Sequence, residues 1–161
     1  MALVIKKWYA ANTANEKGNY VHLVGREAGL FAWILSVLRL DPTTEIEIKN
    51  DLLVFTSSSL SGHTTRVIPM RSLTSAFYGY EKPWKEAILI TVLLAPFVIG
   101  FVIGPLYYFL NKTLAIGVVE GSGWTGGFAF KRSVIEGQNI DEKQAQKVIE
   151  IVRDIIERKT T

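Results

Sequence analysis

The strongest constraint on this chain is an internal run of uncharged residues that extends from Ala87 to Leu110. Charged, soluble-looking sequence lies on both sides of it. As a single helix the run would be about 36 Å long, and the hydrocarbon core of a bilayer is about 30 Å thick. One tilted span is therefore allowed by length, and we expect the run to enter a membrane.

Proline and glycine interrupt the middle of this run, at Pro96, Gly100, Gly104 and Pro105. Proline removes a backbone donor and clashes with the preceding helical turn. A bent or folded-back segment is therefore favoured over a straight rod, and we predict a membrane-inserted hairpin over residues 84–116. Its two arms, of about 14 residues and about 21 Å each, would stop short of the far leaflet.

Basic and aromatic residues flank the run at both ends. Lysine and arginine mark the cytoplasmic ends of membrane segments, and aromatic rings prefer the level of the headgroups. We therefore predict that both ends lie at the same surface of the cell membrane, with the rest of the chain in the cytoplasm. The predicted interface residues are Lys82, Trp84, Lys85, Tyr107, Tyr108 and Lys112.

A hairpin that turns inside hydrocarbon suggests self-association. Unsatisfied backbone groups there cost several kcal/mol each and are tolerated only where protein covers them. Neighbouring copies of the hairpin would provide that cover, so we predict a homo-oligomer. The spacing of Gly100 and Gly104 would permit close helix approach, although the same glycines would also loosen a kinked helix.

The remainder of the chain has the pattern of a β domain. Glu45 to Lys49 alternate strictly between charged and apolar residues, and Asn50 and Asp51 then supply turn chemistry, which predicts a hairpin that continues through Leu52–Phe55. A polar turn is expected over residues 57–62. Further strands are expected at 20–25, 63–68, 73–80, 113–120 and 127–132.

Three other segments complete the predicted organisation. Residues 1–19 end in a polar stretch and are predicted to be an N-terminal tether. Residues 28–40 are predicted to form an apolar helix that is too short to cross a membrane. We expect it to be covered by the domain, by the membrane surface or by a neighbouring subunit. Residues 141–159 form an amphipathic helix, because Asp141 and Gln144 have the spacing of a capping box.

The apolar stripe of this last helix consists of Ala145, Val148, Ile149, Val152, Ile155 and Ile156. Consecutive hairpins followed by one such helix predict an α+β fold. We expect a small antiparallel barrel or sandwich whose open side the helix plugs.

The order of elements resembles the bacterial pleckstrin-homology-like (PH-like) domains. The most suggestive local piece is VIPMRSLTSAFYGY, residues 67–80, and the resemblance covers about residues 44–80 and 113–159. It implies one domain in two parts, 20–83 and 117–161, around the hairpin. It also implies a non-enzymatic scaffold that is often self-associating and membrane-attached. A chain that interrupts one sheet in this way must leave and re-enter on the same side of the bilayer.

No catalytic, cofactor or metal site is predicted. Cysteine is absent, and His22 and His63 lack the spacing of a metal motif. The glycines of GSGWTG, at 121, 123 and 126, match GxGxxG but precede a strand instead of the helix that phosphate binding requires. The serine and threonine residues of 57–65 lack a nucleophile elbow.

The partners expected from the sequence are therefore a bilayer and further copies of the chain. The net charge of +3 is thinly spread, which argues against nucleic acid, and no small-molecule substrate is expected. We predict a membrane-anchored, self-associating scaffold. The alternative is a single-pass accessory subunit of a larger membrane complex, with separate flanking domains.

Overall fold

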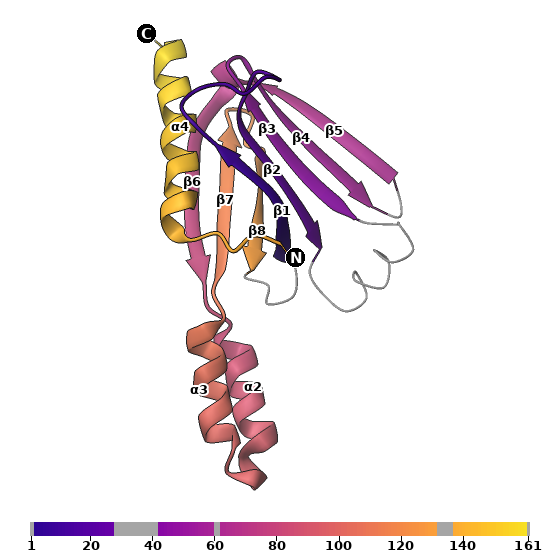
Figure 1. The fold of residues 1–161 in the computed structure, drawn as a ribbon, viewed down its shortest axis with the longest axis vertical. Coiled ribbons are helices and arrows are strands. Elements are labelled where there is room, and N and C mark those ends of the chain that lie inside the picture. The colour runs from indigo at the N-terminus through magenta and orange to yellow at the C-terminus, as the bar shows by residue number, and fades with distance from the viewer. Residues whose placement is uncertain (1, 28–41, 60–61, 132–136, 161) are drawn as a thin grey trace.

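The computed structural model describes residues 2–27, 42–59, 62–131 and 137–160. Their strands form one eight-stranded sheet that is curled into a half-barrel (Figure 1). The strands are β1 (Ala2–Ala10), β2 (Asn19–Glu27), β3 (Thr43–Lys49), β4 (Leu52–Ser59), β5 (Gly62–Pro69), β6 (Leu73–Glu81), β7 (Thr113–Glu120) and β8 (Thr125–Lys131). The fold is therefore α+β, as predicted.

The spatial order β5-β4-β3-β2-β1-β8-β7-β6 divides the sheet into two antiparallel meanders. They meet at a short parallel contact between β1 and β8, in which Leu3 is the register partner of Phe130. The other neighbouring strands pair antiparallel. The expected antiparallel sheet is thus correct except at this seam.

The N-terminal segment is the largest correction to the predicted fold. Ala2–Ala10 is not a tether but the strand at the junction of the two meanders. Leu3 and Ile5 are buried, at 4% and 0% exposure, because their side chains belong to the main core. Only the polar residues after Ala10 connect this strand to β2.

The alternation in β3 has the predicted effect. Ile46 and Ile48 are buried in the core, while Glu45 and Glu47 lie on the opposite face and remain partly exposed. The predicted turn over residues 57–62 begins too early, because Ser57 and Ser58 pair with β5 as part of β4. Hydroxyl side chains are compatible with an exposed strand as well as with a turn.

The C-terminal helix α4 (Glu142–Thr160) packs on the concave side of the sheet, near β6 and the short helix η1 (Met70–Ser72). The predicted capping box is confirmed: the Asp141 amide donates to Gln144 Oε1 and the Gln144 amide to Asp141 Oδ1, at 2.9 and 2.8 Å. The predicted apolar stripe faces the core. Ile151, which the prediction did not include, is buried with it. The buried members are Ala145, Val148, Ile151, Val152 and Ile155.

Side-chain contacts across the open side of the half-barrel stabilise the curvature of the sheet. Arg66 on β5 pairs with Glu120 at the end of β7, at 3.0 Å, and its guanidinium lies 4.3 Å from the ring centroid of Trp124. Phe55 on β4 meets the same indole edge-to-face at 6.1 Å. These side chains link the outer strands of one meander to the β7–β8 turn of the other.

The uncharged run leaves the sheet between β6 and β7, where Glu81 and Thr113 are still register partners. It forms α2 (Trp84–Leu94), the 3-10 turn η2 (Ala95–Phe97) and α3 (Gly100–Leu110). The two helices lie side by side and project away from the half-barrel (Figure 1). The predicted 84–116 insertion extends too far, because residues 113–116 already belong to β7.

The run therefore does not form one continuous helix. Within the described ranges, no helix has both the length and the apolar character needed to cross a bilayer. The apolar helix expected over residues 28–40 lies outside the described residues.

Candidate functional site: an exposed apolar hairpin and its lysine collar

The α2–α3 hairpin buries its small residues and turns its large ones outward. A Cβ added at Gly104 would lie 1.8 Å from Thr91 Oγ1 and 2.9 Å from the Ala87 carbonyl oxygen. A Cβ at Gly100 would lie 2.5 Å from the Thr91 carbonyl oxygen. Only glycine permits so close an approach, so the GxxxG spacing serves contact between the two helices of one chain. The close packing expected of these glycines occurs, but inside the hairpin.

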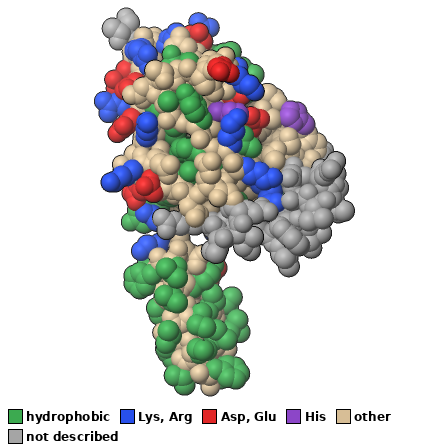
Figure 2. Space-filling view, viewed as in Figure 1, with side chains coloured by type: hydrophobic (Ala, Val, Ile, Leu, Met, Phe, Trp, Pro, Cys, Tyr) green, Lys and Arg blue, Asp and Glu red, His purple; other side chains and the backbone are tan. Residues whose placement is uncertain are grey.

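Hydrophobic side chains cover most of the face of the hairpin that Figure 2 shows. Contiguous apolar patches larger than a few hundred Å² are rare on soluble monomers and mark surfaces for proteins or lipids. Phe97 at the tip is 75% exposed and Phe109 near the base is 70% exposed. The other exposed large residues are Trp84, Ile88, Leu89, Val92, Leu93, Val98, Ile99, Phe101, Val102, Ile103, Leu106 and Leu110.

The tip of the hairpin pairs several of its own backbone groups. The Val98 amide donates to the Ala95 carbonyl at 2.9 Å, and the Val102 amide donates to the Ile99 carbonyl at 3.1 Å. Pro96, one of the predicted inserted residues, lies in this turn and is exposed. These bonds satisfy several backbone groups of the tip within the hairpin itself.

Val98 occupies an unusual backbone conformation at this tip. Its φ of 62° places a β-branched residue in the left-handed region. This backbone conformation raises the free energy of the folded chain by about 1–3 kcal/mol for a β-branched residue. It persists only where the surrounding structure enforces it. The turn is therefore a specific structure and not a loose connection.

Pro105 lies inside α3 and is exposed. It has no N–H to donate to the carbonyl of Phe101, one turn earlier, so that acceptor lacks its usual intrahelical donor. The four residues predicted to be inserted are thus divided between two roles: Gly100 and Gly104 close the helix pair, and the two prolines face outward.

Lysines and aromatic rings lie together at the base of the hairpin. We call Lys82, Lys85 and Lys112, with the rings that they contact, the lysine collar. The Lys82 Nζ lies 4.9 Å from the ring centroid of Tyr108, and the Lys85 Nζ lies 5.7 Å from that of Trp84. Cations at such distances are attracted to the ring face. The collar thus brings together predicted interface residues from both ends of the uncharged run.

Lys112 joins this collar to the folded domain. Its Nζ lies 4.1 Å from the ring centroid of Tyr80 and forms a 2.6 Å ion pair with Glu142 at the start of α4. Tyr107, the remaining predicted interface residue, accepts hydrogen bonds at its carbonyl from the Asn111 amide and side chain, both at 3.0 Å. Sequence reasoning missed Tyr80 and Glu142, because Glu142 is 30 positions from Lys112 and no linear pattern connects them.

An open groove of about 670 Å³ lies beside the collar, and both signs of charge line it, from Glu81, Lys82, Lys85, Glu86 and Lys131. The domain also contains a cavity of about 20 Å³ lined by apolar residues such as Leu23, Phe55 and Val148. That volume is close to the space of one water molecule, and the lining offers no hydrogen bonds to it. It is a gap in core packing, not a ligand site.

Two further polar clusters lie on the sheet. His63 bridges two hydroxyls, with Nδ1 2.8 Å from Ser58 Oγ and Nε2 3.0 Å from Thr65 Oγ1. In a catalytic triad a carboxylate binds the second ring nitrogen of the histidine and stabilises the imidazolium form. His63 has a hydroxyl in that place, so this arrangement is not a catalytic triad.

The predicted turn at GSGWTG is confirmed, since the Gly123 amide donates to the Glu120 carbonyl and β8 follows.

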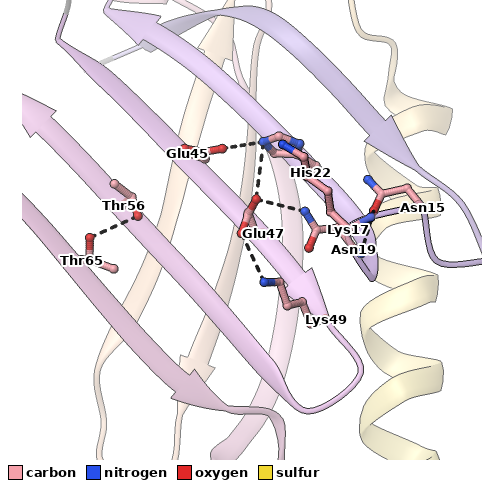
Figure 3. Close-up of polar contacts among 9 residues, drawn as sticks. All are labelled: Asn15, Lys17, Asn19, His22, Glu45, Glu47, Lys49, Thr56 and Thr65. Carbon is pink, nitrogen blue, oxygen red and sulfur yellow. Dashed lines mark hydrogen bonds and ion pairs between the residues drawn. The ribbon is translucent and has the colours of Figure 1, made fainter.

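The second cluster consists of His22, Glu45 and Glu47, whose potential ligand atoms lie within 4.8 Å of one another (Figure 3). No sequence motif predicts this cluster, because the histidine belongs to β2 and the carboxylates belong to β3. Its one sequence signal is the alternation that places both glutamates on the same face of β3.

The half-barrel with its C-terminal helix is compatible with a PH-like fold. Comparison of the chain with protein-family models, with curated proteins and with solved structures gives no match.

Proposed function

We propose that this protein is a non-enzymatic, self-associating scaffold anchored to the cytoplasmic face of a membrane by its α2–α3 hairpin. The observation that carries the proposal is the continuous apolar surface of the hairpin. Full burial of an exposed Leu, Ile, Val or Phe side chain is worth about 1.5–3 kcal/mol, and many such residues are exposed together here. Hydrocarbon would remove this surface from water without requiring a specific partner.

The dimensions of the hairpin favour insertion into one leaflet. Each of its helices has 11 residues, or about 16 Å at 1.5 Å per residue, which is about half of a 30 Å hydrocarbon core. The chain would then enter and leave by the same face, with the lysine collar at the level of the headgroups. This arrangement keeps the whole half-barrel on one side of the bilayer.

Self-association is supported by the backbone of the inserted segment. The Phe101 carbonyl lacks the donor that residue 105 would normally supply, and a backbone acceptor left without any donor is costly in hydrocarbon. A neighbouring hairpin packed on this side of α3 would bury the acceptor in protein, the setting in which such groups are tolerated at membrane depth. A homo-oligomer would also present several half-barrels together, which is the arrangement that a scaffold requires.

Vesicle flotation tests the anchoring. The matched variants are F97E/F101E, which places charge on the hairpin, and L52E/V67E, which places the same charges at exposed apolar positions of β4 and β5. We expect the unmodified chain and the L52E/V67E variant to float with liposomes and the F97E/F101E variant to remain in the dense fraction. Equal flotation of both variants would contradict anchoring by the hairpin.

One observation favours a second function, that of an accessory subunit in a larger membrane complex. Gly100 and Gly104 are already occupied by contact with α2, so they do not supply a small-residue interface between copies. The mass of the detergent-solubilised protein separates the two functions. A large homogeneous self-assembly supports the scaffold, and a monomer supports the accessory subunit.

A further inference from the structure

The polar cluster on the outer face of β2 and β3 has the composition of a metal-binding site. His22 is the register partner of Glu47, and Glu45 lies two residues before Glu47 on the same face of β3. The His22 Nε2 is 2.5 Å from Glu45 Oε1 and 3.9 Å from Glu47 Oε1. Figure 3 shows the imidazole directed at both carboxylates.

We propose that His22, Glu45 and Glu47 bind one divalent transition-metal ion of the Zn²⁺ class. One imidazole nitrogen and two carboxylate oxygens are ligands that Zn²⁺ accepts, with water in a fourth position. Metal–ligand bonds of about 2.0–2.2 Å place neighbouring ligand atoms about 3.4 Å apart in a tetrahedral site. The two distances from Nε2 lie on either side of this value, and all three ligand atoms lie within 4.8 Å of one another, so side-chain shifts without a change of fold would complete the site.

The burial of His22 fixes the position of its ring beside the two carboxylates. The side chain is 5% exposed, and its Nδ1 has no hydrogen-bond partner within the described part of the chain. Its polar contacts in this region are made through Nε2, which faces the carboxylates. An imidazole held in this way presents one nitrogen to the cluster.

Asn19 gives a second indication. It is fully buried, and its Nδ2 donates to Glu47 Oε1 at 3.0 Å, whereas its Oδ1 has no partner among the described residues. Groups that hold a metal ligand in place are a regular component of metal sites. The hydrogen bond from Asn19 holds the Glu47 carboxylate in place, so Asn19 is assigned as a positioning residue.

The charges of the cluster also favour a cation. Two carboxylates lie close together, and among the described residues Lys49 places its Nζ 3.8 Å from Glu47 Oε2, while His22 contacts both carboxylates. A divalent ion between Glu45 and Glu47 would offset both negative charges. It would also clamp β2 to β3 on the face opposite the core, at a place separate from the hairpin and its proposed role.

Isothermal titration of the full chain in detergent, after removal of metals by a chelator, tests the proposal with ZnCl₂ and with MgCl₂. We expect one Zn²⁺ per chain and no comparable binding of Mg²⁺. The H22A and E47Q variants should each lose at least tenfold in Zn²⁺ affinity. The matched control is H63A, which removes the other histidine of this cysteine-free chain and should bind as the unmodified protein does.

Two further measurements keep the test decisive if H22A fails to fold. E45Q preserves the size of its side chain and should also lose at least tenfold in Zn²⁺ affinity, and N19A should lose about tenfold, as outer-shell partners usually do. The absorption spectrum of bound Co²⁺ reports the ligands directly. Absence of Zn²⁺ binding to the unmodified chain, or unchanged affinity in E45Q and E47Q, would overturn the proposal.

Discussion

The half-barrel and the hairpin are built from similar apolar residues but distribute them in opposite ways. In α4, Val148 and Ile155 are 1% and 0% exposed, and the opposite face of the helix is charged. In α3 the buried residues are Gly100 and Gly104, while Phe109 is 70% exposed. The difference shows that α4 has the sheet as a partner, whereas the hairpin's main contact within the described part of the chain is the narrow one between its own helices.

The largest expected change in the free energy of unfolding comes from shortening a large apolar side chain in the core of the half-barrel. The same change in the hairpin serves as the comparison. Leu23 is fully buried in the core and Leu93 is 64% exposed on α2. We expect L23A to lower the free energy of unfolding by about 2–5 kcal/mol and L93A to change it by less than about 0.5 kcal/mol. Chemical denaturation followed by tryptophan fluorescence measures both, and equal losses would remove the contrast between the regions.

An intermediate effect is expected at the contact between α2 and α3. G104A places a Cβ against Thr91 Oγ1, and overpacking of this kind costs about 1–3 kcal/mol. Hydrogen exchange should therefore become faster at amides of α2 and α3 and stay unchanged in β1 to β5. The control is G79A, where an added Cβ meets nothing within 4 Å. Unaltered exchange in G104A would show that the helices do not depend on this close approach.

The smallest effect concerns the surface link between α4 and the β3–β4 turn. A hydrogen bond from Lys159 and the charge of that lysine lower the pKa of Asp51 below its ordinary value of 3.8. Because the folded-state pKa is depressed, the stabilisation is present at neutral pH and is lost as the pH falls through the folded-state pKa. D51N should therefore be slightly less stable than the unmodified chain at pH 6, and the difference should shrink as the pH is lowered towards 2.

Denaturation at both pH values measures this convergence, and the K159M variant should show the same profile, since it removes the other partner of the pair. A difference between D51N and the unmodified chain that persists undiminished near pH 2 would exclude the ion pair as its cause. Unlike L23A, this change acts at the surface of the half-barrel and leaves its core intact.

Features with a local signal were predictable from the sequence. The alternation at Glu45–Lys49 indicated β3 and its turn, the Asp141–Gln144 spacing indicated the start of α4, and Pro96 indicated that the uncharged run does not form one helix. In each case residues within a few positions decide the structure. The paired arms of the hairpin followed from the same reasoning.

Features that depend on distant partners were not predictable. Leu3 and Ile5 resemble a short apolar start until β2 and β8 are placed on either side of them. The cluster of His22 with Glu45 and Glu47 requires the register of β2 against β3. The ion pair from Lys112 to Glu142 requires that α4 begin beside the end of α3. Strand neighbours and register are properties of the whole sheet, so no local pattern contains them.

The seam between β1 and β8 also affects the order in which the nascent chain can mature. Leu3 must await Phe130, and at about 5–20 residues per second the ribosome needs about 6–25 s to synthesise the intervening chain. The apolar face of α4 follows later still. The hairpin therefore emerges while the first meander lacks its cover, so two unprotected apolar surfaces coexist during synthesis.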